Sequence, residues 1–250
     1  MDVSKFTDKF IEIVREAEHS DNKKLRLLRS SLLKTVDLIG PKNFVTLSAN
    51  ILKNNFRIEG CEDARLPLKR IFNVSLEDLD GFLKKKRYPV GRGHPLHMLS
   101  MDHVNSVGRL KTMDDTLSAI EGASSDEYLI EALNELNGLY SELDIHIRKE
   151  EEVFFPLLEK CGMEEHPEAL REEHKKFRGI LSELTGLGAA AVLGDRRNVM
   201  EKILYLKQNF IPVIANHIFR ETYVFYPAAL EFIKEADQWE KIRQGFEAVR

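Results

Sequence analysis

The sequence contains few cysteines, prolines and glycines. Only two of its 250 residues are cysteine, Cys61 and Cys161. Two thiols are too few for a disulfide framework or for a zinc or iron–sulfur site with four thiolates. The 8 prolines and 14 glycines are also too sparse for a loop-rich β fold, so we expect helices. The scarcity of cysteine is typical of a reduced, cytoplasmic environment.

Long apolar runs are absent as well. Every apolar stretch is shorter than the roughly 18 residues that a membrane-spanning helix requires. The first ten residues, MDVSKFTDKF, are polar from the second residue and lack the apolar core of a secretory signal. Hydrophobic residues make up 43% of the chain and charged residues 31%, which allows a sizeable core and disfavours disorder. We therefore expect a folded cytoplasmic protein without a membrane segment.

The net charge of −4 conceals an uneven distribution. Residues 1–93 carry 19 Lys and Arg against 13 Asp and Glu, and residues 94–250 carry 18 against 28. The segment KKKRYPVGRG, residues 84–93, has the composition of a basic linker. We predict a helical N-terminal domain over residues 1–92 and a second domain over 93–250. The basic domain suggests a protein partner, while the absence of a recognisable DNA-binding motif disfavours nucleic acid.

The second domain has the apolar spacing of long helices. Apolar residues recur at intervals of three and four over 126–155 and 197–226, and shorter runs mark one helix before them and one between them. Breaks fall at 121–125, 161–167 and 186–195. We predict an all-α, up-and-down antiparallel four-helix bundle.

The N-terminal part also has amphipathic spacing. It predicts helices over 3–19, 22–39 and 42–56, with Gly40-Pro41 as a stop and a restart. Ser75 has the position of an N-cap for a further short helix.

An internal repeat emerges when the sequence is shifted by 71 residues. HIRKEEEVFFP, from His146 to Pro156, then overlies HIFRETYVFYP, from His217 to Pro227. The same shift places His103 on His174, each directly preceded by an acidic residue. Each half contains a His and, 43 residues later, His-x-x-x-Glu. The two halves have the pattern of duplicated helical hairpins.

The spacing within the repeat has a geometric consequence. A His and a Glu four residues apart lie one turn apart on the same helix face. His146 continues an apolar stripe that includes Leu143, and His217 continues one that includes Phe210 and Val213, so both should point inward. Two such hairpins bring four imidazoles and two carboxylates into one bundle core.

Carboxylates without a counter-charge cost several kcal/mol to bury, so a cation is expected among them. Imidazole and carboxylate together suit iron, manganese or zinc, and two carboxylates shared by two halves suit a metal pair. The neighbouring Glu151 and Glu152 are assigned to a solvated face. A lone inward His is more often a satisfied core residue than a ligand, but the repeated pattern favours metal. The candidate ligands are His103, His146, Glu150, His174, His217 and Glu221.

Two other metal folds are disfavoured by the order of these residues. Ferritin-like carboxylate proteins use Glu-x-x-His, with the Glu first and a shorter gap. The zinc-protease motif His-Glu-x-x-His is absent from the sequence.

At these residues the chain resembles the hemerythrin-like, or HHE cation-binding, family over roughly residues 93–233. The resemblance is carried by GHPLH at 93–97, by His146–Pro156, by Glu173-His174 and by His217–Glu221. It implies an up-and-down four-helix bundle with an oxo- or hydroxo-bridged di-iron centre, for which zinc or manganese could substitute. By the same resemblance the four histidines of the repeat would be terminal ligands, and Glu150 and Glu221 would be bridges.

The chain departs from the oxygen-carrying members of the family. Those proteins have a further His one turn after the His of the third helix, where this chain has Arg178, and the repeat-related position is Val107. A symmetric set of four His and two Glu is similar to proteins proposed to repair iron centres. Those proteins carry an N-terminal cysteine pair, whereas Cys61 is the only cysteine in this region.

His94 and His97 are further candidate ligands at the entry to the first bundle helix. Either could supply a fifth His or replace His103, or they could line the bundle mouth or satisfy helix-end groups. Trp239 and Phe246 suggest a short C-terminal helix that closes the bundle end.

Three functions remain open at this stage. The first is a di-iron protein that senses, binds or handles O2 or NO under redox or nitrosative stress. The second is a di-iron enzyme: an oxidase, a peroxide or NO reductase, or an iron-centre repair protein. The third is a structural metal site in an interaction protein.

Overall fold

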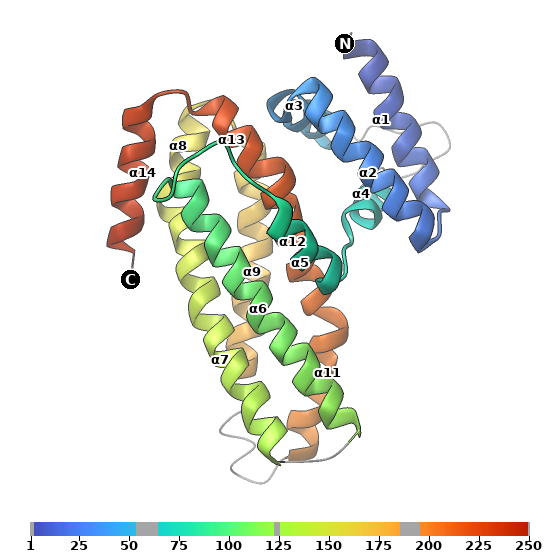
Figure 1. Ribbon diagram of the computed structural model, residues 1–250, viewed down its shortest axis with the longest axis vertical. Coiled ribbons are helices and arrows are strands. Elements are labelled where there is room, and N and C mark those ends of the chain that lie inside the picture. The colour runs from blue at the N-terminus through green and yellow to red at the C-terminus, as the bar shows by residue number, and fades with distance from the viewer. Residues whose placement is uncertain (1–2, 54–64, 123–125, 186–195, 250) are drawn as a thin grey trace. The chain divides into compact units, whose positions relative to one another are not determined.

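The computed structural model describes residues 3–53, 65–122, 126–185 and 196–249, and these residues form helices and no strand (Figure 1). The predicted all-α class is confirmed. None of the described helices is long and apolar enough to cross a membrane. The chain packs as two compact units, one of Met1–Asn73 with Phe219–Lys234 and one of Val74–Ile218 with Glu235–Arg250.

The first unit is built on short amphipathic helices with clear boundary residues. Asp21 caps the second of them, since its carboxylate accepts a 2.8 Å hydrogen bond from the backbone N–H of Lys24. Gly40, with φ of 85°, ends that helix, and Pro41 begins the next, as the sequence predicts. The elements are α1 (Val3–Glu18), α2 (Asn22–Ile39), α3 (Pro41–Lys53), α4 (Arg65–Phe72), η2 (Glu221–Phe225) and α13 (Tyr226–Phe232).

Two arginines hold the helix ends of this unit together. Buried Arg29 donates from Nε to the carbonyl of Ile71 at 2.6 Å, at the end of α4. Arg70 donates to the carbonyls of Ala17 and Ser20, at 2.7 and 2.6 Å, around the end of α1. Both guanidinium groups therefore satisfy carbonyls that a helix terminus leaves without intrahelical partners. Part of the basic excess of the N-terminal region thus has a structural role.

The second unit contains the bundle helices. α6 ends at Gly122 and α7 begins at Asp126 at the same end of the bundle, so the chain reverses direction between them (Figure 1). Fully buried leucines such as Leu99, Leu110 and Leu139 fill the core. The elements are α5 (Leu76–Lys85), α6 (Pro95–Gly122), α7 (Asp126–Arg148), η1 (Lys149–Phe154), α8 (Phe155–Lys160), α9 (Glu165–Thr185), α11 (Arg196–Asn209), α12 (Ile211–Arg220) and α14 (Ala236–Ala248).

Several helix boundaries of this unit follow the sequence signals. Ser75 accepts a 3.2 Å hydrogen bond from the backbone N–H of Asp78 and caps α5, as predicted. The predicted break at 161–167 occurs after α8, where Gly162 has φ of 91°. The predicted break at 186–195 lies outside the described residues.

The fourth bundle helix corrects one expectation. α11 ends at Asn209 and α12 begins at Ile211, and the N–H groups of Val213 and Ile214 both bond to the carbonyl of Phe210. The buried residues Phe210, Ile214 and His217 nevertheless keep the helical spacings of four and three. Val213 is 48% exposed, and Ile214 is buried in its place. The prediction that Val213 points inward is wrong, although Phe210 and His217 are buried as expected.

The predicted C-terminal helix is α14. Its residues Trp239, Ile242 and Phe246 are buried. The ring of Trp239 lies 6.0 Å from that of Phe154 in η1, and Gly245 comes so close to Val153 that no side chain would fit there without a shift. α14 therefore packs directly on the η1 turn.

Candidate metal centre

Six polar side chains are buried to 1% exposure or less at matching points of the repeat. Each hairpin places one His on its first helix, α6 or α9, and the second on the following helix, α7 or α12. A Glu follows the second His by one turn, at the beginning of a π-helical segment. The six are His103, His146, Glu150, His174, His217 and Glu221.

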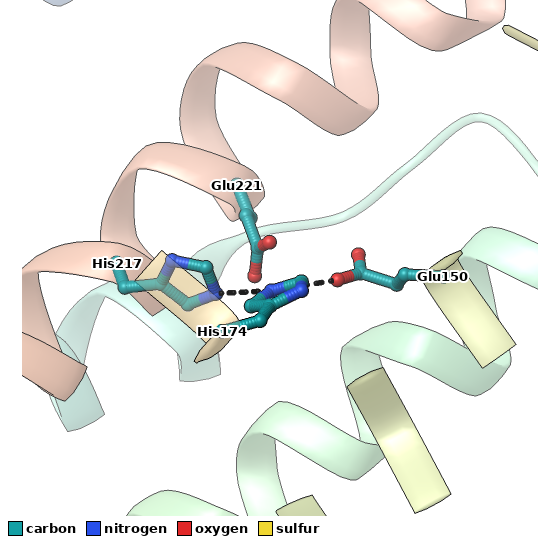
Figure 2. A group of neighbouring side chains, drawn as sticks. All are labelled: Glu150, His174, His217 and Glu221. Atoms are coloured by element: carbon teal, nitrogen blue, oxygen red, sulfur yellow. Dashed lines mark hydrogen bonds and ion pairs between the residues drawn. The ribbon is translucent and has the colours of Figure 1, made fainter. Parts of the chain in front are cut away.

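Their ligand atoms gather into two groups that share one residue. Glu150, His174, His217 and Glu221 form the first group, in which one ligand atom of each residue lies within 4.8 Å of the others. Figure 2 shows these four side chains pointing toward one another. His103, His146 and Glu221 form the second group by the same criterion. The sequence-predicted residues are therefore brought together, with Glu221 common to both groups.

The distances also place Glu150 between the histidines of both hairpins. Its Oε2 lies 3.4 Å from Nε2 of His174 and 3.7 Å from Nε2 of His146. Nε2 of His174 lies 3.2 Å from Nε2 of His217 (Figure 2). Imidazole nitrogens and carboxylate oxygens converge from different helices, and this donor chemistry fits iron, manganese or zinc. The buried carboxylates also fit a cation, because it offsets their cost of burial.

Each glutamate of the repeat begins a π-helical turn. The carbonyl of Glu150 accepts from the N–H of Phe155, five residues on, and the carbonyl of Glu221 accepts from the N–H of Tyr226. The next residue is a proline in both cases, Pro156 and Pro227. A proline has no N–H to donate and its ring clashes with the carbonyl four residues earlier, so it disfavours the regular α-helical register. π-turns of this kind occur frequently at functional sites.

Comparison with known proteins agrees with this geometry. The family model of the hemerythrin HHE cation-binding domain matches residues 94–229, which is more than half of the chain. The chain belongs to the hemerythrin HHE cation-binding family. No curated protein and no solved structure matches it. Membership assigns cation binding to the bundle, in agreement with the buried His and Glu groups.

A second layer of carboxylates surrounds the imidazoles of the hemerythrin domain. Oε2 of Glu173 lies 2.9 Å from Nδ1 of His217. Oδ2 of Asp102 lies 3.5 Å from Nδ1 of His146. A carboxylate on Nδ1 favours the tautomer whose Nε2 is free to bind a metal. Asp102 and Glu173 are the acidic residues that directly precede the first His of each repeat. The sequence shows this pairing, but it does not show that each carboxylate contacts the second His of its hairpin.

Glu151 belongs to the same layer. Its Oε1 lies 2.9 Å from Nδ1 of His174, and its Oε2 accepts a 2.7 Å hydrogen bond from Arg178. The side chain of Glu151 is 20% exposed, so the prediction that it belongs to a solvated face is wrong. Glu152, by contrast, is 52% exposed and pairs with Arg148 as a surface residue. The phase of α7 could not reveal Glu151, because its partners come from a different helix, α9.

Two of these outer carboxylates, Glu151 and Asp102, have a pKa below the ordinary value. Burial alone would raise the pKa of Glu151, but hydrogen bonds with His174 and Arg178 lower it below its ordinary value. Burial likewise opposes ionisation of Asp102, and its interactions with His146 and Lys149 bring its pKa down. The anionic carboxylates therefore face the imidazoles on the side away from the candidate metal.

The two histidines at the start of α6 lie outside both ligand groups among the described residues. Nδ1 of His94 accepts a 3.2 Å hydrogen bond from the N–H of Leu96, and its ring lies 4.4 Å from that of Trp239. Burial lowers the pKa of His94, which favours the neutral ring that this hydrogen bond requires. His94 thus satisfies a helix-end group, one of the alternatives expected from the sequence. His97 is half-buried in the first turn of α6.

Proposed function

We propose that the hemerythrin domain binds two iron ions and uses them to sense, bind or handle O2 or NO. His103 and His146 would hold one ion and His174 and His217 the other, with Glu150 and Glu221 shared between them. The proposal rests on the position of the two glutamates between the histidines of the two hairpins. Oε2 of Glu150 lies within 4 Å of histidines from both hairpins, and Glu221 belongs to both ligand groups.

The surroundings of the site favour a small, uncharged ligand. The ring of Phe155 stacks on His174 with centroids 5.9 Å apart, and the ring of Phe177 meets His217 edge-on at 5.0 Å. Both phenylalanines are fully buried. These two rings give the surroundings of the histidines an apolar part that disfavours charged substrates, whereas a diatomic gas carries no charge to desolvate. Bound ferrous iron would supply the electrons and the coordination chemistry for such a ligand.

Purification without oxygen tests the metal content. We expect about two irons per chain, as two symmetric half-sites imply. A ligand present at a thousand times its Kd stabilises a fold by about 4 kcal/mol, so chelation of the metal should lower the melting temperature. The Glu150→Ala, Glu221→Ala double variant should bind little iron, and Glu152→Ala, which removes an exposed neighbour, should bind as much as the unaltered protein.

The optical spectrum after addition of O2 or NO distinguishes the functions. A reversible charge-transfer band supports ligand binding or sensing. Rapid turnover of peroxide or NO would instead assign a di-iron enzyme. Absence of iron would contradict both; bound zinc, together with altered folding of the double variant, would instead indicate a structural site.

A further inference from the structure

The residues two positions before and after each glutamate of the repeat differ between the hairpins. These positions lie nearly opposite the glutamate on the helix, and so they form the outer face of the turn. In the first hairpin they are Arg148 and Glu152, an ion pair at 2.7 Å whose side chains are 34% and 52% exposed. In the second hairpin the repeat places Phe219 and Tyr223 there, and their rings stack with centroids 4.9 Å apart. Phe219 is fully buried and Tyr223 is half-buried.

The ring of Phe219 packs among the N-terminal helices. Cζ of Arg29 in α2 lies 5.8 Å from the centroid of this ring, and the ring of Phe72, at the end of α4, lies 6.3 Å from it. Arg29 is itself buried and donates hydrogen bonds to the carbonyls of Ile71 and Asn73. A guanidinium group over an aromatic face is attractive, and more strongly so away from water. The ring of Phe219 is thus fixed by α2 and α4.

The turn and the helix that follow Phe219 belong to the same unit. α3 contacts both η2 and α13. Nζ of Lys42 in α3 lies 4.4 Å from the centroid of the Phe232 ring in α13. The carboxylate of Glu231 comes so close to Gly40 that a Cβ added there would lie 3.3 Å from its Oε2. Glu221 is therefore carried by a segment that forms part of the core of the N-terminal helices.

We propose that Phe219 and Tyr223 are positioning residues for Glu221, and that through them α2 and α4 respond to occupancy of the metal centre. The inference rests on the proposed metal function. An ion that binds only the folded state stabilises the segments that position its ligands, and Glu221 belongs to both ligand groups. The coupling is reciprocal, so the N-terminal helices that fix this turn also raise the affinity for metal.

The Tyr223→Leu variant of the full chain tests the positioning role. Leucine keeps an apolar side chain at this position but removes the stacked ring. We expect the affinity for Co²⁺, measured against a competing chelator, to fall by roughly 10-fold, the lower end of the effect of losing a residue that orients a ligand. The visible spectrum of bound Co²⁺ should also change, because the carboxylate of Glu221 is displaced. Tyr223→Phe retains the ring and should restore both the affinity and the spectrum.

The matched control is Glu152→Leu. Glu152 has the position of Tyr223 in the first hairpin and is exposed, so this variant should leave both the affinity and the spectrum unchanged.

Hydrogen exchange tests the response of the N-terminal helices without any substitution. At saturating Co²⁺, the backbone amides of α2 and α4 should exchange more slowly than in the metal-free protein, as should those of α7 and α9, which carry ligands. In Tyr223→Leu at saturating Co²⁺, the added protection of α2 and α4 should diminish, whereas that of α7 and α9 should persist.

The possible failures are distinguishable. Protection of α7 and α9 without protection of α2 and α4, or an affinity and spectrum unchanged by Tyr223→Leu, would overturn the inference and leave the metal function standing. The same loss of affinity in Tyr223→Phe or in Glu152→Leu would also overturn it, because the effect would not depend on the stacked ring. Failure of the unaltered protein to bind Co²⁺ would overturn both proposals.

Discussion

The two hairpins of the bundle share their ligands and differ in what supports them. Both place a His-x-x-x-Glu sequence ahead of a proline-terminated π-turn. In the first hairpin, α14 packs on η1, and Glu151 of η1 bonds to the outer nitrogen of His174 in the other hairpin, whereas the matching residue of η2 is Thr222. The ligand arrangement is thus a local property of each helix, whereas the support of the ligands depends on neighbouring helices.

Both hairpins have a proline directly after the π-turn. Replacing these prolines is expected to have the largest effect on stability and metal affinity. The Pro156→Ala variant supplies the missing N–H and permits a regular α-helix. Proline inside a helix is less favourable than alanine by about 3 kcal/mol. The free energy of unfolding of the metal-free variant, measured with urea, should therefore be higher than that of the unaltered protein by part of this amount. Metal affinity should fall, because Glu150 turns away from His146.

Pro227→Ala should act in the same way if the two turns are equivalent. Pro167→Ala is the control, since Pro167 lies in the first turn of α9, where a proline removes no helical hydrogen bond. A Pro156→Ala protein that is less stable but binds metal normally would show that tertiary packing, and not the proline, sets the π-turn.

Gly245→Ala tests what distinguishes the first hairpin. A Cβ at Gly245 would lie 2.5 Å from Cγ1 of Val153 in η1. Overpacking of this kind costs roughly 1–3 kcal/mol, because the branched valine side chain has little freedom to move. Urea unfolding should show this loss, and α14 should become more accessible to protease.

Two glycines that match each other in the repeat provide the control. Gly108 in α6 and Gly179 in α9 have nothing within 4 Å of an added Cβ. Alanine at either position should stabilise the protein by roughly 0.5–1 kcal/mol, since glycine is unfavourable inside a helix. Equal destabilisation by Gly245→Ala and Gly179→Ala would refute a specific contact between α14 and η1.

The smallest effect is expected on the exposed face of α14. Arg243 donates two hydrogen bonds to Glu240, at 2.6 and 2.8 Å, and these, with a further bond from Gln244, lower the pKa of Glu240 from 4.5 to about 2. Because the folded-state pKa is the lower one, the pair stabilises the protein above pH 4.5, and the contribution is lost as the pH falls toward 2.

Comparison of the urea midpoints of the unaltered protein and Glu240→Gln across this pH range checks the direction. The difference should be small, because exposed ion pairs contribute little, and it should vanish at the acidic end. A difference that grows with acidity would contradict the assigned direction.

Most of the fold could be predicted because its signals are local. Asp21, Gly40-Pro41 and Ser75 mark helix ends through hydrogen bonds to nearby backbone groups, and a stripe of leucines specifies a buried face. Val213 was predicted wrongly, because spacings of three and of four both fit an inward stripe, and the packing buries the adjacent Ile214 instead. The role of residues 1–92 as a separate domain that contacts a protein partner stays a prediction.

The sequence by itself determined which side chains form the candidate metal centre. The 71-residue repeat and the spacing of His-x-x-x-Glu act through the period of the α-helix, which needs no knowledge of neighbours. Only the tertiary structure decided the outer layer. Glu151 reaches His174, and Arg178 reaches Glu151 and Asp144, across helices that are far apart in the chain. Such contacts depend on the packing and rotation of whole helices, and these are properties that a local sequence pattern does not specify.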